Sequence, residues 1–207
     1  MASACSRSGR SRQEITLIAV TKIFGPEVIE AAYELGLREF GENYVQEFAG
    51  KAPRVTRLSG AKFHLIGHLQ SNKSKTAADL FQAIQTVDTS KLAERLEAVG
   101  RKLEIMLEVK LSNEEAKHGA SPDELPALIA SVRQCPNLNL LGLMTVPPWS
   151  EDQEVTRPYF HRLREVGRLH GLPCLSMGMS HDFEAAIEEG ATHIRVGTAL
   201  FGSRKKA

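Results

Sequence analysis

A regular alternation of short apolar runs with amphipathic segments is the feature that most constrains how this chain can fold. Runs rich in branched apolar residues recur eight times, at residues 15–22, 38–43, 62–69, 83–88, 104–111, 138–146, 174–180 and 193–202. This rhythm favours a parallel sheet in which a helix follows each strand. Eight such units can close a (β/α)8 TIM barrel, so we predict an α/β protein with a single barrel domain.

The segments between the runs carry signals for helix ends. Pro26 suits a first helical position and Gly36 a helix stop, while Ser121 and Glu124 fit a capping box. Ser180 is expected to cap the helix after the seventh run. An open doubly wound sheet is the alternative, but it usually has fewer strands, and no GxGxxG motif follows the first run. The barrel is therefore the favoured architecture.

Composition is typical of a globular protein with one core. The 207 residues are 42% hydrophobic and 25% charged, and no linker rich in Pro, Gly and Ser divides them. We expect a short polar leader at 1–13, frayed and solvated, the barrel at 14–203 and a charged tail at 204–207. The net charge of +1 provides no field that would attract nucleic acid or a membrane surface, so neither is an expected partner.

The cysteines and the hydropathy pattern bear on location. Cys5, Cys135 and Cys174 are scattered and odd in number, which argues against a disulfide framework and favours a reducing compartment. No apolar run approaches the length that spans a bilayer. The leader has the arginines and serines of a transit peptide but is short, so we predict a cytoplasmic protein.

The ends of three runs carry candidate functional groups, because barrels of this kind gather their chemistry at the C-terminal ends of the strands. Lys22 ends the first run on the same face as Ile18 and Val20, and so can point into the barrel mouth. A lysine there is more often a solvated strand end; the functional alternative is a partly desolvated amine that condenses with an aldehyde.

The seventh and eighth runs predict an anion site. The seventh run, SMGMS, leads into a helix at Ser180, where backbone N–H groups and the helix dipole favour negative charge. The eighth reads RVGT, with Arg195 and Gly197 on one face and the hydroxyl of Thr198 beside them. Each glycine alone is more often a turn or packing residue, but the two adjacent run ends and an inward arginine together favour a phosphate site.

Two histidines raise the question of a metal site. His64 and His68 lie four residues apart, a spacing that suits metal ligands on a helix. Here they fall on a strand-like run, and no acidic or cysteine partner lies close in sequence. We therefore predict no metal site at this pair.

Taken together, these motifs resemble one known family. IAVTK, FGENYVQE, FHLIGHLQSNK, LGLMTVPP and LSMGMSHDFEAAIEEGATHIRVGTALFG closely resemble the YggS/PROSC family, the pyridoxal phosphate (PLP) homeostasis proteins, over about residues 13–203. The resemblance implies a fold-type III PLP barrel like the N-terminal domain of alanine racemase, with PLP as cofactor. It also implies roles for individual residues: a Schiff base on Lys22, phosphate contacts at Ser180, Gly197 and Thr198, Arg195 beside the pyridine nitrogen, and pocket positions at Asn43, His64, Met144 and Met177.

The chain departs from the family pattern at three places. A short polar leader stands where the family usually has a helix before the first strand. Lys110 replaces a frequent asparagine. His181, which borders the predicted phosphate loop, replaces a common aspartate and is expected to alter affinity without removing the site.

The resemblance implies a protein that buffers PLP or delivers it to apo-enzymes, without clear catalytic turnover. An arginine beside the pyridine nitrogen disfavours its protonation, which weakens PLP as an electron sink. Racemases of this fold take a second base from a further β-domain, and this chain ends shortly after the last run, so a monomer is expected. A PLP-dependent amino-acid racemase or decarboxylase is the alternative, and a PLP-responsive interaction protein is a weaker one.

Overall fold

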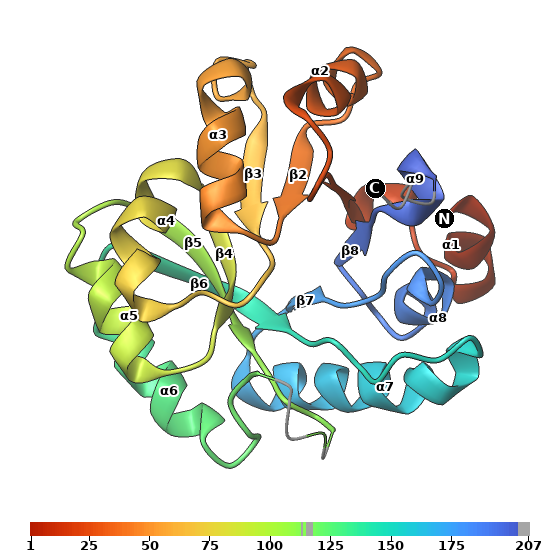
Figure 1. The fold of residues 1–207 in the computed structure, drawn as a ribbon. Coiled ribbons are helices and arrows are strands. Elements are labelled where there is room, and N and C mark those ends of the chain that lie inside the picture. Colours follow the sequence, from red (N-terminus) through yellow and green to blue (C-terminus); the bar gives the residue numbers. More distant parts are fainter. Residues whose placement is uncertain (113, 115–117, 203–207) are drawn as a thin grey trace.

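The chain forms a closed parallel barrel, seen in a computed structural model that describes residues 1–112, 114 and 118–202. The strands follow one another in chain order, and β8 pairs with β1 to close the barrel (Figure 1). They are β1 Thr16–Val20, β2 Glu39–Glu42, β3 Lys62–Leu65, β4 Ala83–Val87, β5 Leu103–Glu108, β6 Leu138–Met144, β7 Cys174–Ser176 and β8 His193–Val196. Each strand overlaps the run predicted for it, which confirms the TIM barrel.

Helices surround the barrel on the outside (Figure 1). They are α1 Ala2–Ser8, α2 Pro26–Glu34, α3 Val45–Val55, α4 Ser74–Leu80, α5 Ser90–Glu97, α6 Leu125–Arg133, α7 Gln153–His170, α8 Phe183–Glu188 and α9 Thr198–Phe201, with 3-10 turns η1 Arg12–Glu14 and η2 Ser71–Lys73. Pro26 is the first residue of α2, as predicted, and Gly36 follows its end in the left-handed region at φ 94°. None of the helices in the described ranges is long and apolar enough to cross a membrane.

The main apolar core lies between the barrel and its helices. Phe48 of α3 contacts the rings of Phe63 and Phe81, with ring centroids 4.8 Å away in each case. All three side chains are fully buried, so this cluster fixes α3 and α4 against the outer surface of β3. Burial of an aromatic side chain of this size stabilises a fold by about 1.5–3 kcal/mol.

A chain of hydrogen bonds crosses the inside of the barrel. His64 pairs with Glu39 through Nε2 and with the Gln85 side chain through Nδ1. Ser176 Oγ donates to the side-chain oxygen Oε1 of Gln85 at 2.6 Å, and Arg195 donates to Ser176 Oγ at 2.7 Å. Each member therefore has a partner, as buried polar groups require, and the chain of bonds runs from β2 across the barrel to β8.

The expectation of a frayed, solvated leader is wrong for residues 2–8. They form helix α1, which packs on α8 and buries Ala4 and Cys5. Arg7 binds Glu184 and Glu188 of α8 at 2.6 Å each, and Gly9 ends α1 in the left-handed region at φ 67°. A helix therefore precedes the first strand after all. Sequence patterning missed it because its apolar face is only two small residues wide.

Candidate functional site

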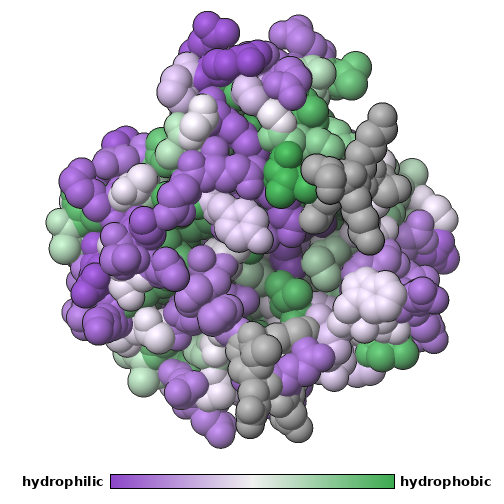
Figure 2. All heavy atoms as spheres, in the orientation of Figure 1, coloured by the Kyte–Doolittle hydropathy of each residue, from purple (hydrophilic) through white to green (hydrophobic). Residues whose placement is uncertain are grey.

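A cavity opens at the C-terminal ends of the strands and holds most of the predicted site residues. Its volume is about 360 Å³, and its lining comes from the loops after β1, β2, β3, β6, β7 and β8. In the orientation of Figure 1 the molecular surface is mainly hydrophilic, with hydrophobic residues showing in depressions near the middle of the face (Figure 2). Six of the nine predicted site residues line the cavity: Lys22, Asn43, Ser180, Arg195, Gly197 and Thr198.

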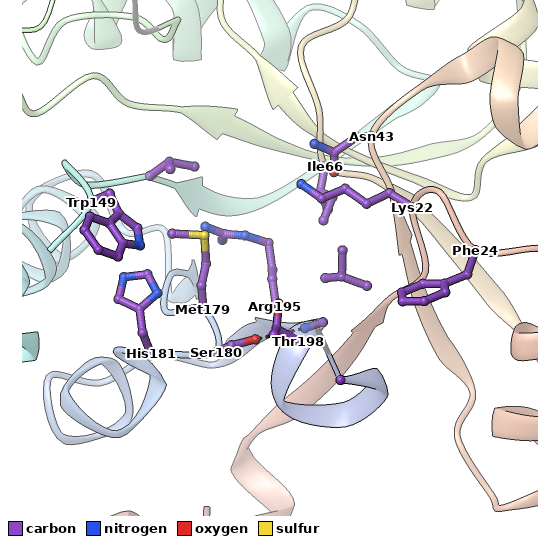
Figure 3. A pocket seen from close by; sticks show the side chains of 14 residues that line it. Lys22, Phe24, Asn43, Ile66, Trp149, Met179, Ser180, His181, Arg195 and Thr198 are labelled. Atoms are coloured by element: carbon purple, nitrogen blue, oxygen red, sulfur yellow. Dashed lines mark hydrogen bonds between the residues drawn. The ribbon is translucent and has the colours of Figure 1, made fainter. Parts of the chain in front are cut away.

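Lys22 extends from the end of β1 into this cavity, toward Arg195 and Met179 (Figure 3). It occupies a tight turn in which the Phe24 N–H donates to the Thr21 carbonyl oxygen at 3.1 Å. The next residue, Ile23, has φ 63°, a left-handed conformation that is unfavourable for a β-branched side chain. Its N–H donates to the Glu47 carboxylate at 2.5 Å, so α3 holds the strained turn that presents Lys22.

Beneath the turn lies a second lysine that sequence reasoning missed. Lys51 of α3 is buried and donates to the Thr21 carbonyl oxygen at 3.1 Å and to both Glu42 carboxylate oxygens at 3.0 Å. Its ammonium also lies 2.6 Å from Glu47. Thr21 Oγ1 donates to Glu42 at 2.8 Å, so one buried ion cluster fixes both sides of Lys22. The signal was present in the FGENYVQE run, where Glu42 and Glu47 precede Lys51 by nine and four residues.

The loops after β7 and β8 converge on one point of the cavity. Ser180 Oγ accepts hydrogen bonds from the backbone N–H groups of Gly197 at 3.2 Å and Ala199 at 3.3 Å, at the start of α9. The prediction that Ser180 caps α8 is therefore wrong. Helix α8 begins after Asp182, and the Ser180 hydroxyl binds the N-terminal end of α9 instead. A Cβ on Gly197 would lie 3.3 Å from the Val20 carbonyl oxygen, so glycine lets these elements approach closely.

Arg195 carries fixed positive charge to the cavity floor. Its guanidinium donates to Ser176 Oγ at 2.7 Å and to the Thr145 carbonyl oxygen at 2.8 Å, and the residue is only 4% exposed. Burial lowers the pKa of Arg195 to about 10, which leaves it charged at neutral pH. The two hydrogen bonds fix the orientation of the group, so it can act as a directed donor toward a ligand.

The structure does not bring the other three predicted residues to the cavity lining. His64 lies one layer deeper, inside the barrel, between Glu39 and Gln85. Met144 is fully buried, and Met177 belongs to the apolar core around the helices. Gly178, with φ 91°, interrupts the strand alternation, which is why Met179 rather than Met177 lines the cavity.

Trp149, which sequence reasoning did not single out, and His181, which it placed beside the phosphate loop, complete the rim. Trp149 and His181 lie beside each other across the cavity from Lys22, with ring centroids 6.1 Å apart (Figure 3). Their signal was their position directly after the sixth and seventh runs. The buried atom Asn43 Oδ1 has no hydrogen-bond partner among the described residues, so the cavity presents a polar atom suited to a ligand. His181 Nε2 lies 3.3 Å from the Asp182 carboxylate.

Glu108 lies on the opposite side of the barrel from Lys22, at the end of β5. Burial, reinforced by the negative charge of Asp88 and opposed by Arg195, raises the pKa of Glu108 to about 7. Its Oε2 has no hydrogen-bond partner within the described part of the chain. This carboxyl group is therefore partly protonated near neutral pH.

The chain is similar to proteins of one well-defined group. It matches the family described as alanine racemase, N-terminal domain, over residues 7–205. The pyridoxal phosphate homeostasis protein of Aquifex aeolicus is 43% identical over 98% of this chain and 92% of its own length. That of Pseudomonas aeruginosa is 44% identical over 97% and 90%.

Solved structures give the same grouping. PipY of Synechococcus elongatus with PLP bound has a TM-score of 0.87 and 37% identity, covering 96% of this chain and 97% of its own. An alanine racemase of Clostridium difficile has a TM-score of 0.74 at 12% identity, covering 99% of this chain and 56% of its own, a likeness of fold alone. The resemblance and the fold expected from the sequence are both confirmed.

Proposed function

Because the chain belongs to the family of the alanine racemase N-terminal domain and the pyridoxal phosphate homeostasis proteins, we propose that it binds PLP reversibly and buffers or delivers it. The observation that carries the proposal is the convergence, in one cavity, of a lysine, an anion cradle and a fixed arginine. These are the three kinds of group that an aldehyde, a phosphate and a ring nitrogen require.

The cavity suits the chemistry of PLP at each of its ends. The N–H groups of Gly197 and Ala199 point at the Ser180 hydroxyl, and with Thr198 they offer a phosphate several donors. Lys22 reaches the middle of the cavity, where its amine would hold the aldehyde as a Schiff base. The unpartnered Asn43 oxygen is available to a ring substituent. When bound, PLP supplies a reactive aldehyde and a conjugated ring that accepts electrons.

We further propose that the bound cofactor is stored rather than used for turnover. Arg195 is held in place as a cation, and a second positive charge on a neighbouring ring nitrogen would cost electrostatic energy in this buried setting. A racemase also needs a second base. No tyrosine occurs among the described residues that line the cavity, and Tyr44 is 57% exposed outside it.

The proposal extends to location and partners. All three cysteines are free, and Cys5 and Cys135 are buried, as suits a cytoplasmic protein in a reducing compartment. We propose a monomer whose partners are PLP and apo PLP-dependent enzymes, with no role for nucleic acid or membranes. The position of the cavity supports transfer, because its lining residues lie at the C-terminal ends of the strands, at the mouth of the barrel.

Two measurements on one preparation test this function. PLP-loaded protein is mixed with an apo aminotransferase, and the recovery of aminotransferase activity is compared with that given by free PLP. The loaded protein is separately assayed for racemisation and decarboxylation of amino acids. Reactivation with no amino-acid turnover is expected. Turnover at an ordinary enzymatic rate, on the order of 1 s⁻¹ or faster, would instead establish the racemase or decarboxylase alternative.

A further inference from the structure

Three potential metal ligands meet at the barrel mouth, away from the cavity that holds Lys22. His68 follows β3, Asp88 follows β4 and His118 lies in the connection after β5. One ligand atom from each lies within 4.8 Å of the other two. In a closed barrel of this order, these strands lie opposite β7, β8 and β1, so the cluster is across the mouth from the phosphate cradle.

The side chains are accessible enough to bind an ion and close enough to share one. The His68 and Asp88 side chains are 37% and 14% exposed, and His68 Nδ1 lies 3.9 Å from Asp88 Oδ2. Both residues also line a surface groove. Nitrogen and oxygen ligands lie about 2.0–2.2 Å from a zinc ion. The distances between the ligand atoms of this cluster would therefore shorten by only about an ångström when they share one ion.

The two imidazoles need one rearrangement to bind the same ion. Their rings are stacked with centroids 3.6 Å apart and planes 10° from parallel. Because a metal binds an imidazole nitrogen in the ring plane, one ring must rotate out of the stack. His118 is exposed on a connecting loop, so its ring can rotate at low cost.

The chemistry of the three groups favours a cation at this place. His68 and His118 each offer an imidazole nitrogen, a common ligand of zinc. Asp88 contributes a carboxylate, and it lies near enough to Glu108 to raise the pKa of that carboxyl group. A divalent ion would bind one carboxylate directly and relieve its repulsion with the other.

We propose that His68, Asp88 and His118 form a binding site for a divalent transition-metal ion, best suited to Zn²⁺ with water as a fourth ligand. The ion would tie together the loops after β3, β4 and β5. The sequence led to the expectation of no metal because His64 and His68 fall on a strand-like run without an acidic or cysteine partner close in sequence. The partners proposed here, Asp88 and His118, come from other loops. The proposal does not depend on PLP binding, since none of its three residues lines the Lys22 cavity.

Equilibrium dialysis of the tag-free protein against Zn²⁺ tests the site, with the absorption of bound Co²⁺ as a second readout. We expect the wild type to bind one equivalent and His68→Ala and His118→Asn to bind Zn²⁺ at least about tenfold more weakly. Loss of a residue that only orients a metal ligand typically weakens binding by about 10–100-fold, and loss of the ligand itself should cost at least the lower value. Zn²⁺ should also raise the melting temperature of the wild type and not that of the variants.

Matched controls separate this site from adventitious binding. His170→Ala removes a histidine at the end of α7, and Cys174→Ser removes the one cysteine that is not buried. Both should bind Zn²⁺ like the wild type, as should Lys22→Ala. Equal affinity in the wild type and His68→Ala, or a loss of binding in Cys174→Ser alone, would overturn the proposal. Tetrahedral Co²⁺ spectra that disappear in His118→Asn would sustain it even if affinities were modest.

Discussion

Two lysines lie at the same end of the barrel and differ in almost every physical respect. Lys51 is buried in α3, where Glu42, Glu47 and the Thr21 carbonyl oxygen bind its ammonium. Lys22 stands on a strained turn above it and projects into an open cavity. The lower lysine is surrounded by fixed negative charge, whereas the upper one faces the space where a ligand fits.

The difference indicates that one lysine stabilises the fold and the other is available for ligand binding. A buried lysine with two carboxylates is held as an ion and contributes order, because removal of one partner leaves uncompensated charge. A lysine at a strand end can be exchanged with little effect on the core, so it can be used for covalent binding. The two lysines should therefore respond in opposite ways to mutation.

The first prediction gives the largest expected effect, a complete loss of function. Lys22→Ala should abolish the covalent PLP adduct, because Lys22 is the only lysine among the described residues that line the cavity, while the melting temperature stays close to that of the wild type. Absorbance of the PLP–protein complex and thermal unfolding measure the two properties. The control is Lys91→Ala, which removes an exposed lysine of α5. An unfolded Lys22→Ala variant would mean that Lys22 is structural.

The second prediction reverses this pattern. Lys51→Met should lower the free energy of unfolding by about 3–5 kcal/mol, because it leaves the buried Glu42 carboxylate without its cation. Urea denaturation measures the loss. Adding Glu42→Gln to that variant should recover much of it, since the unpaired charge is then gone. Equal stability of Lys51→Met and the wild type would remove the distinction between the two lysines.

A third prediction concerns Glu108, a buried carboxyl group whose pKa of about 7 lies above the ordinary 4.5. The folded protein then holds a proton that the unfolded chain has lost, so stability falls as pH rises from 4.5 to 7. Glu108→Gln should match the wild type at about pH 4 and exceed it by about 3 kcal/mol at about pH 8. Urea midpoints at both pH values test this; a difference independent of pH contradicts it.

The smallest effect is expected on the phosphate side of the cavity. Thr198→Val removes one hydroxyl and keeps the size of the side chain, so PLP affinity should fall by about 1 kcal/mol, roughly fivefold, while the adduct still forms. A PLP titration of the variant beside the wild type measures the change. Unchanged affinity would remove Thr198 from the phosphate site.

Most of the fold was predictable because it depends on local patterns. The eight runs of branched residues, the Pro26 start and the Gly36 stop each act over a few residues, and they gave the strands and helices in the observed order. Helix α1 was missed because Ala4 and Cys5 make too narrow an apolar face, and because its contacts with α8, including those of Arg7, join residues far apart in sequence.

The site was predictable only in part, for a related reason. Lys22, Ser180 and Gly197 stand at strand ends, where position in the barrel alone places them at the mouth. Depth within the barrel has no comparable local signal. The assignment of His64 to the pocket came from the family resemblance alone, and in the structure His64 lies in the layer below the cavity. The cluster around His68 depends on contacts between distant loops, which one sequence does not display. Lys51 was missed although its partners Glu42 and Glu47 lie close to it in sequence.

The central claim is that Lys22 is the attachment point for PLP, and borohydride reduction followed by peptide mass spectrometry tests it most directly. Purified protein is incubated with PLP, reduced and digested, and the pyridoxyl group is located. The account predicts a single adduct on Lys22. An adduct on Lys51, or one spread over exposed lysines such as Lys75 and Lys91 with none on Lys22, would contradict it.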